Sequence, residues 1–340
     1  MQGRNELCAV LVYSDRANGR IKEIDFSALD NSEGIFGHIS AQDVSEQENL
    51  WGAIIQDEPV FAYERVSHHG QVIAALLCSS YEVGKNARSM VRVIYDNSDD
   101  TPAASVYGLN DVLQTSGISG LEKVSNFGGA QRLRRYLDNQ SMCSRQNSVE
   151  GIVNIGGQHH FYLEPHNVLV VPVGEKDEYI VYSGNQVADG VQGKLAKALG
   201  IPKNKVTVRT KRTGGAFGGK ERYILILGRF QGNRYCSNVL HMGYMLEYIF
   251  DEIFRCHTTL IAGLAARKFG RPVRLSLTSS EDMMFSGAKH EVIVNYCVTF
   301  DESGKILTAT FKAFANAGCS LDNSVVWVQV KNEFLIYALT

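Results

Sequence analysis

The chain has 340 residues, of which 44% are hydrophobic and 21% charged, and this composition is ordinary for a soluble globular protein with one large domain or two smaller ones. Its formal net charge of −2, without a long run of Lys or Arg, disfavours nucleic acids and anionic membranes as partners. The N-terminus lacks the layout of a signal peptide and charged residues interrupt the longest apolar region, so we expect a cytoplasmic protein without a transmembrane helix.

The first part of the chain alternates short apolar runs with turns and predicts a small mixed α/β domain that ends near Asn97. Ser79 or Ser80 can cap a helix, and Ser40 can cap a shorter helical turn. The expected strands are 7–13, 21–26, 35–39, 70–78 and 91–95, and the expected helix is 81–90. Strand, helix and strand over 70–95 form a βαβ-like unit.

Residues 98–148 are largely polar and predict a linker or surface crossing, after which a second α/β segment begins near Val149. The expected helices here, 187–199 and 258–269, are each followed by a glycine and then a proline, as is typical of helix ends. The expected strands are 152–155, 167–173, 178–182, 206–211, 273–277, 291–300 and 306–317, the last two joined as a hairpin. The pattern predicts an α+β (mixed α/β) fold.

Seven cysteines, an odd number, are scattered along the chain. None belongs to a C-x-x-C pair, which disfavours a zinc ribbon or an iron–sulfur cluster. Most lie among apolar residues, as Cys8 does, so we expect buried, reduced thiols.

A glycine-rich loop, residues 213–221 with the sequence TGGAFGGKE, follows the expected strand 206–211. Glycine allows a ligand to approach the main chain closely, so such a loop often exposes N–H groups to an anionic ligand. The G-x-x-x-x-G-K spacing fits a phosphate-binding P-loop, but Glu221 stands where that motif needs Ser or Thr for Mg²⁺. A purely structural turn with Phe217 in the core is a second interpretation of the pattern.

A third interpretation comes from three segments that resemble, in the right order, signatures of the molybdenum hydroxylases, the xanthine dehydrogenase and aldehyde oxidase family. They are 208–221 (VRTKRTGGAFGGKE), 156–164 (GGQHHFYLE, with His159 where Glu is usual) and 270–274 (GRPVR) followed by 281–283 (EDM). The resemblance implies a hammerhead-like α/β domain over 1–97, a linker over 98–148 and a partial molybdopterin-binding α/β domain over 149–340, within which 228–256 is a non-family insertion.

The resemblance also implies a function, that of part of a molybdenum-cofactor oxidoreductase that hydroxylates purines, hypoxanthine and xanthine to urate, with oxygen derived from water. Gln186, Phe217 and Gly218 match cofactor-contacting positions, and none of them is a direct metal ligand. Glu221 matches the carboxylate that binds and polarises the purine in xanthine dehydrogenases, whereas aldehyde oxidases generally have an apolar residue there. The alternatives are an aldehyde oxidase-type hydroxylase and an inactive truncated paralogue that acts as a binding or assembly module.

Several parts of the family's machinery are expected outside this chain. No catalytic residue is assigned, because the general base is expected beyond the chain end, and the FAD and [2Fe-2S] domains of the full-length family are absent. We therefore expect the chain alone to be inactive, and the full-length family implies a homodimer. Adjacent His159 and His160 on a strand point to opposite faces, which predicts packing or hydrogen bonding rather than a shared metal.

Overall fold

This computed structural model describes residues 5–17, 19–51, 56, 58–96, 147–174, 177–220, 256–289 and 291–315. The chain divides into two compact units, the first formed by Met1–Thr101 with His160–Gly287 and the second by Pro102–His159 with Ala288–Thr340. The predicted linker and the predicted insertion lie almost entirely outside the described residues, and the predicted domain boundaries stay a prediction.

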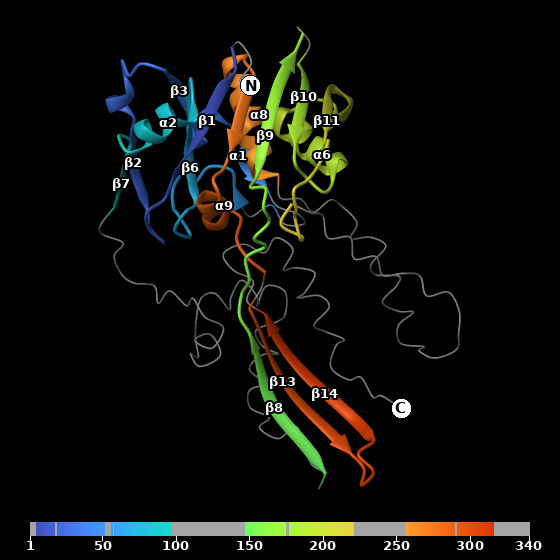
Figure 1. Ribbon diagram of the computed structural model, residues 1–340. Coiled ribbons are helices and arrows are strands. Elements are labelled where there is room, and N and C mark those ends of the chain that lie inside the picture. Colours follow the sequence, from blue (N-terminus) through green and yellow to red (C-terminus); the bar gives the residue numbers. More distant parts are fainter. Residues whose placement is uncertain are drawn as a thin grey trace. The chain divides into compact units, whose positions relative to one another are not determined.

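A seven-stranded mixed sheet forms the framework of the first unit, in the order β11-β10-β9-β12-β1-β6-β3 (Figure 1). The strands are β1 (Leu7–Tyr13), β3 (Ile35–Ser40), β6 (Val72–Cys78), β9 (Asn167–Val173), β10 (Glu178–Ser183), β11 (Val206–Arg209) and β12 (Val273–Ser276). β1 is parallel to β12 and β10 to β11, whereas the other four neighbouring pairs are antiparallel. Strands that are distant in the sequence thus share one sheet.

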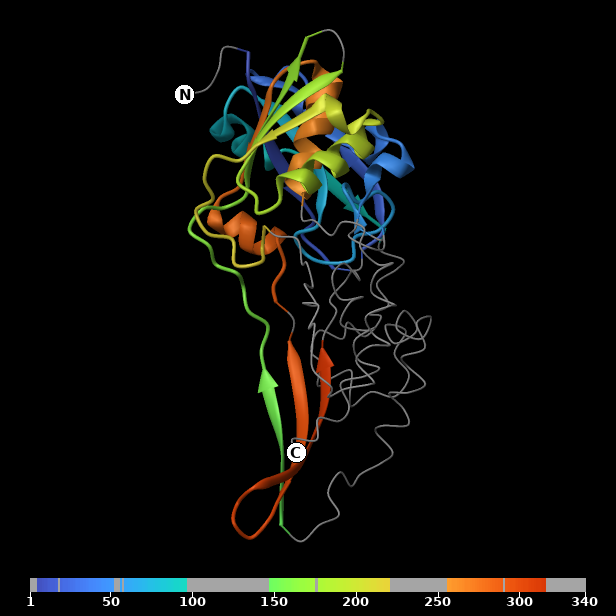
Figure 2. The same cartoon turned by 90° about the vertical axis from the view of Figure 1, so that its right-hand side faces the viewer.

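Helices cover both faces of this sheet. α6 (Ala188–Leu199) packs on β11, α8 (His257–Phe269) packs on β9 and β12, and the two helices lie against each other (Figure 2). α2 (Tyr81–Arg88) packs against β1, β6 and β3. Ala75 and Leu77 of β6 belong to the larger core, whereas Leu76 and Cys78 belong to the cluster that includes Ala87 of α2. Because successive strand side chains point to opposite faces, the continuous apolar run of β6 is buried on both faces, as predicted.

Glycines end α6 and α8 at the predicted positions. Gly200 and Gly270 have φ of 66° and 61°, a left-handed conformation that costs other residues roughly 1–2 kcal/mol. The sequence did not reveal α9 (Ser279–Phe285), although it carries a capping signal. Thr278 Oγ1 accepts the N–H of Glu281 (3.3 Å), and Glu281 Oε2 accepts the N–H of Thr278 (2.9 Å).

Shorter elements complete the first unit. They are β2 (Ile21–Asp25) with β7 (Arg92–Tyr95), β4 (Leu50–Trp51) with β5 (Glu58–Pro59), η1 (Ser27–Leu29), η2 (Ala41–Asp43), α1 (Glu46–Asn49) and η4 (Lys203–Lys205). Ser40 caps η2 as predicted, since its Oγ accepts the N–H of Gln42 (3.4 Å) and Asp43 accepts the N–H of Ser40 (2.9 Å). None of the described helices has the length and apolar character needed to cross a membrane.

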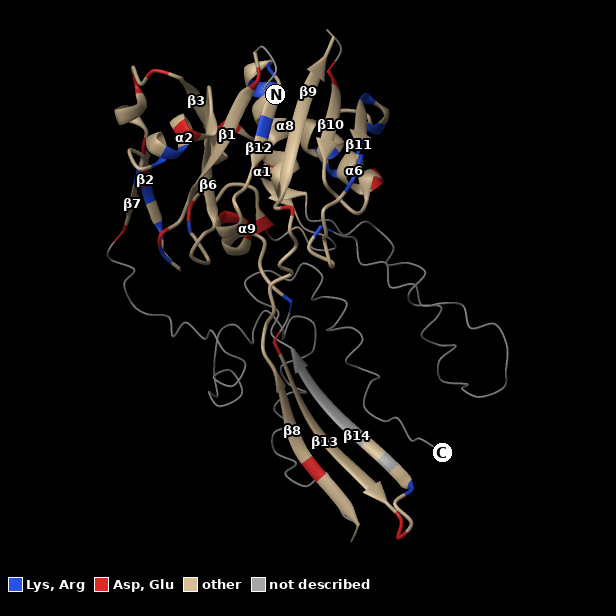
Figure 3. Ribbon diagram, viewed as in Figure 1, with Lys and Arg blue, Asp and Glu red and all other residues tan. Residues whose placement is uncertain are grey.

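The second unit contains an antiparallel sheet in the order β14-β13-β8. Its strands are β8 (Ser148–Ile155), β13 (Val292–Phe300) and β14 (Ile306–Ala315). The predicted hairpin is confirmed: Asp301 Oδ1 accepts the N–H groups of Ser303 (2.9 Å) and Lys305 (3.0 Å), and Gly304 has φ of 84°. Charged residues gather at this hairpin tip (Figure 3).

The cysteines follow the prediction only in part. Cys8, Cys78 and Cys256 are buried, reduced thiols. Cys297 of β13 is disulfide-bonded, so the expectation of a reduced thiol is wrong for this residue. The spacing of cysteines along a chain does not determine which of them meet in space, and sequence alone therefore gave no sign of this bond.

Candidate functional site

Four segments of the first unit meet where strands β9 to β12 of the seven-stranded sheet begin or end. β10 and β11 are parallel, so the residues that follow both strands leave at the same edge. β9 is antiparallel to β10 and β12, and its first residue, Asn167, lies opposite Ser276, the last residue of β12. Loops beyond the carboxyl ends of strands are a common place for ligand sites in α/β proteins. The segments brought together are 160–166, 184–187, 210–220 and 277–285.

The glycine-rich loop turns tightly between Ala216 and Gly219, where the N–H of Gly219 donates to the carbonyl of Ala216 (2.7 Å). Gly215, Phe217 and Gly218 have positive φ values of 92°, 49° and 90°. This conformation is unfavourable for Phe by roughly 1–2 kcal/mol, so the surrounding structure must hold it. Phe217 is 66% exposed, and the interpretation of this residue as part of the core is therefore wrong.

Glu164 contacts both ends of the loop. Its Oε2 accepts the N–H of Gly214 (2.7 Å), and its own N–H donates to the carbonyl of Gly214 (3.1 Å). Lys220 Nζ donates to the main-chain oxygen (2.6 Å) and to Oε2 (3.2 Å) of Glu164. Burial raises the pKa of Glu164, but hydrogen bonds from Gly214 and Asn167 and the charge of Lys220 outweigh it and lower that pKa below its usual value.

The position of Lys220 also bears on the P-loop interpretation. Its side chain is only 1% exposed, and its ammonium group donates hydrogen bonds to Glu164. In a P-loop the equivalent lysine reaches the phosphates of the nucleotide. The described geometry therefore adds a second argument against nucleotide hydrolysis, beside the carboxylate of Glu221.

Gln186 lies beside the end of the loop. Its N–H donates to the carbonyl of Lys220 (2.9 Å), and its side chain is exposed. The neighbouring Asn185 accepts the hydroxyl of Thr213 at its carbonyl (3.2 Å). Two hydrogen bonds therefore join the segment after β10 to the two ends of the glycine-rich loop.

The structure brings together three of the four residues singled out from the sequence. Gln186 is on one segment, and Phe217 and Gly218 are on the loop to which that segment is hydrogen-bonded. Glu221, the predicted substrate-binding residue, follows Lys220 directly in the sequence and lies outside the described residues.

A buried polar cluster supports the segment 160–166. Asp282 of α9, a helix with adjacent acidic residues (Figure 3), accepts the hydroxyl of Tyr162 (2.5 Å) and the N–H of His166 (2.5 Å), and it lies 2.8 Å from His166 Nδ1. Burial raises the pKa of Asp282, but the hydrogen bonds and the interaction with His166 lower it to about 2. The Tyr162 ring in turn lies 4.7 Å from Lys220 Nζ.

Sequence reasoning missed this cluster and the pair formed by Glu164 and Lys220. The partners are 116–120 residues apart in the cluster and 56 residues apart in the pair, so no local pattern connects them. His159 and His160 lie beyond the end of β8 and not on a strand, so that part of the prediction is wrong, and the ring of His160 lies 6.4 Å from that of Tyr162. Within the described ranges, no group of three or more His, Cys, Asp or Glu residues is placed to hold a metal ion.

Gly219 is a loop position with no room for a side chain. A Cβ there would lie 2.6 Å from Cε1 of Tyr162 and 2.8 Å from Cγ of His160. We expect Gly219→Ala to displace both rings and to lower the free energy of unfolding by about 1–3 kcal/mol in urea titrations. Gly156→Ala is the matched control, because no atom lies within 4 Å of its Cβ, and it should change stability by less than about 0.5 kcal/mol. Equal effects would contradict the close approach at Gly219.

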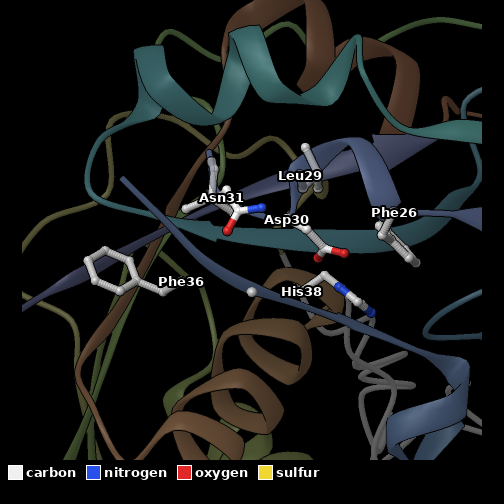
Figure 4. A pocket seen from close by; sticks show the side chains of 8 residues that line it. Phe26, Leu29, Asp30, Asn31, Phe36 and His38 are labelled. Carbon is white, nitrogen blue, oxygen red and sulfur yellow. The ribbon is translucent and has the colours of Figure 1, made fainter. Parts of the chain in front are cut away.

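A pocket of about 200 Å³ lies beside β3, the outermost strand on the side of the sheet opposite β11 (Figure 4). The rings of Phe26 and His38 stack there with their centroids 3.7 Å apart. Its lining includes Phe26, Leu29, Asp30, Asn31, Phe36 and His38. No residue singled out from the sequence lines this pocket, so it is separate from the candidate site.

Comparison with known proteins gives two family matches. Residues 1–99 match the a/b hammerhead domain of aldehyde oxidase and xanthine dehydrogenase. Residues 136–227 and 253–337 match the molybdopterin cofactor-binding domain. The unmatched residues 228–252 lie within the predicted insertion, 228–256.

Relatives and solved structures agree with these matches. Aldehyde oxidase 3 of Rattus norvegicus is 30% identical over 324 residues, which are 95% of this chain and 21% of that protein. Xanthine dehydrogenase/oxidase of Gallus gallus is 33% identical over 320 residues, 94% of this chain and 20% of that protein. The chain thus spans about a fifth of the length of these relatives.

The solved structure of quinoline 2-oxidoreductase from Pseudomonas putida 86 has a TM-score of 0.69 and 17% identity, with 92% of this chain and 36% of that chain covered. This likeness concerns the fold alone, and it confirms the mixed α/β architecture that the sequence predicts. Taken with the two family matches, it leads to one conclusion: the chain belongs to the aldehyde oxidase and xanthine dehydrogenase family of molybdenum hydroxylases.

Proposed function

We propose that the glycine-rich loop and Gln186 form part of the molybdopterin site of a molybdenum-cofactor oxidoreductase that hydroxylates purines. The observation that best supports this proposal is the main-chain geometry at the loop tip, Phe217 and Gly218. The N–H groups of Phe217 and Gly218 donate no hydrogen bond to another group in the described part of the chain, and both residues have positive φ. Main-chain N–H groups that make no hydrogen bond within the described residues suit a ligand with anionic or hydrogen-bond-accepting oxygens.

Each residue has a separate role in this proposal. Phe217 and Gly218 offer main-chain hydrogen bonds to the cofactor, and the exposed amide of Gln186 donates a hydrogen bond to one of its oxygens. The bound cofactor supplies the redox chemistry of hydroxylation, with oxygen derived from water, and the protein supplies orientation and electrostatics. The general base, the FAD and the [2Fe-2S] clusters are assigned to other parts of the full-length proteins, so we expect no urate formation by this chain alone.

Glu221 favours a purine as the substrate. A carboxylate accepts hydrogen bonds from purine N–H groups, whereas an aldehyde group has no such donor to offer. The second candidate, an aldehyde hydroxylase, is favoured by a relative that is named an aldehyde oxidase and is 30% identical. A third possibility, an inactive paralogue that assembles with complete subunits, predicts co-purification with a molybdenum enzyme without cofactor of its own.

Loading the purified chain with molybdopterin tests the cofactor site. We expect retention near one equivalent, measured by the fluorescence of the oxidised pterin after release. Gln186→Ala removes a donated hydrogen bond and should weaken retention about tenfold, since a net loss of about 1.4 kcal/mol corresponds to that factor. Gln42→Ala, at an exposed position on η2, is the matched control and should retain the pterin normally. No retention by the parent chain would contradict the proposed site.

Binding of xanthine and benzaldehyde to the loaded chain, measured by calorimetry, separates the two substrate classes. Glu221→Val should weaken xanthine binding about tenfold or more, because a charge-assisted hydrogen bond is lost, and should leave benzaldehyde binding unchanged. Xanthine binding that is insensitive to this change would favour the aldehyde candidate. The homodimer and the cytoplasmic location implied by the family resemblance stay predictions, and sedimentation velocity tests the first.

A further inference from the structure

Glu164 and Lys220, called the loop anchor below, have no direct role in the proposed function. We propose that the loop anchor is a positioning pair, which fixes both ends of the glycine-rich loop so that Phe217 and Gly218 present their N–H groups to the cofactor. This inference rests on the proposed function for its purpose, but its geometry stands on the observed contacts alone.

One carboxylate joins both ends of the loop. Glu164 Oε2 accepts the N–H of Gly214 (2.7 Å) and also contacts Lys220 Nζ (3.2 Å). The residues between these two points include three glycines, which lose the most backbone entropy when they become ordered. A loop closed at both ends has fewer alternative conformations, so its tip is held near the binding geometry before the ligand arrives.

Neighbouring side chains support the loop anchor. The Tyr162 ring lies beneath Lys220 Nζ at 4.7 Å, and the Tyr162 hydroxyl donates to Asp282 of α9 (2.5 Å). The preceding residue of α9, Glu281, accepts a hydrogen bond from Arg88 of α2 (2.6 Å). The loop ends are thus connected through side chains to α9, and α9 is connected to α2, which packs on the sheet.

The two residues of the loop anchor are buried to different extents. Lys220 is 1% exposed at its side chain, whereas Glu164 is 30% exposed. A buried ammonium group needs a charged or strongly hydrogen-bonding partner, since its desolvation is costly. Glu164 supplies its carboxylate and its main-chain oxygen, and loss of the carboxylate would leave Lys220 with the main-chain oxygen alone, which would loosen the loop.

Hydrogen–deuterium exchange of the cofactor-free chain tests the anchor directly. We expect Glu164→Gln and Lys220→Met to accelerate exchange in a peptide covering 212–220 about tenfold or more, with exchange in β9 and β10 unchanged. Lys205→Met is the matched control. It removes an ion pair with Glu178 (2.7 Å) that joins the starts of β11 and β10 and leaves the loop contacts intact. Its loop exchange should equal that of the parent chain.

The rate of pterin release from the loaded chain gives a second readout. Both anchor variants should release pterin about tenfold faster, and the double variant no faster than either single one, because the two residues act as one pair. Unchanged loop exchange in Glu164→Gln would overturn the proposal. Acceleration that spreads equally to β9 and β10, or loss of folding in both variants, would also overturn it, since the pair would then serve general stability. Failure of the parent chain to retain pterin contradicts the proposed function but leaves the exchange result valid.

Discussion

The Asp282→Ala variant should unfold with a free energy about 2–5 kcal/mol below that of the parent chain, because it removes a buried carboxylate that accepts two hydrogen bonds. Asp282 is 4% exposed and accepts the hydroxyl of Tyr162 and the N–H of His166. Its removal leaves the His166 N–H without this acceptor and leaves the Tyr162 hydroxyl with its contact to His166 Nδ1 (2.9 Å), in a site that water reaches poorly.

Fluorescence in urea titrations can measure this loss within the first unit. The chain has two tryptophans, and a Trp327→Phe background leaves Trp51, which is buried in the core of that unit. Asp30→Ala is the matched control, because Asp30 is exposed, and it should change stability by less than about 0.5 kcal/mol. A similar small change in Asp282→Ala would show that the cluster is not a major source of stability.

The same carboxylate should give the stability of the first unit a defined pH dependence. The pKa of Asp282 is lowered from 3.8 to about 2, so its contribution is fully present above pH 3.8 and is lost as the pH falls through about 2. The shift corresponds to roughly 2 kcal/mol. Asp282→Asn should lack this component, so the difference in stability between the parent and this variant should shrink between those pH values. A difference that is independent of pH would contradict the assignment.

Leu195→Ala should lower the free energy of unfolding by about 2–5 kcal/mol, the range for truncating a fully buried Leu. Leu195 is 0% exposed and lies where α6 meets α8. A Cβ on Gly263 of α8 would lie 2.2 Å from Leu195 Cδ1, so the leucine fills the space that the glycine leaves open. Leu163→Ala is the matched control, because Leu163 is 91% exposed and its truncation opens no cavity.

A second substitution makes this prediction sharper. Gly263→Ala should destabilise the parent chain, because the new methyl group collides with Leu195, and should stabilise the Leu195→Ala variant by filling part of its cavity. The same urea titrations measure both effects. If Gly263→Ala destabilises both backgrounds equally, the two positions do not share the space that the structure assigns to them.

The local features of this protein and its family could be predicted from the amino-acid sequence. Gly200 and Gly270 predicted the ends of α6 and α8, because glycine is the usual residue in the left-handed position that follows a helix. The continuous apolar runs of β1 and β6 predicted strands buried on both faces. The glycine-rich loop was visible because four glycines in six residues leave a pattern within a short window. The family resemblance placed Gln186, Phe217 and Gly218 in one site, and the hydrogen bond from Gln186 to Lys220 is compatible with that.

The surroundings of the glycine-rich loop could not be predicted in this way. Phe217 is exposed rather than buried, and neither the loop anchor nor the Asp282 cluster could be read from the chain. The same holds for the sheet, in which β12 lies between β9 and β1 although these strands are distant in the sequence. Composition and periodicity report on a residue and its near neighbours. Strand order and buried ion pairs depend on contacts between residues that are distant in the sequence, and these contacts form only when the complete sheet has assembled.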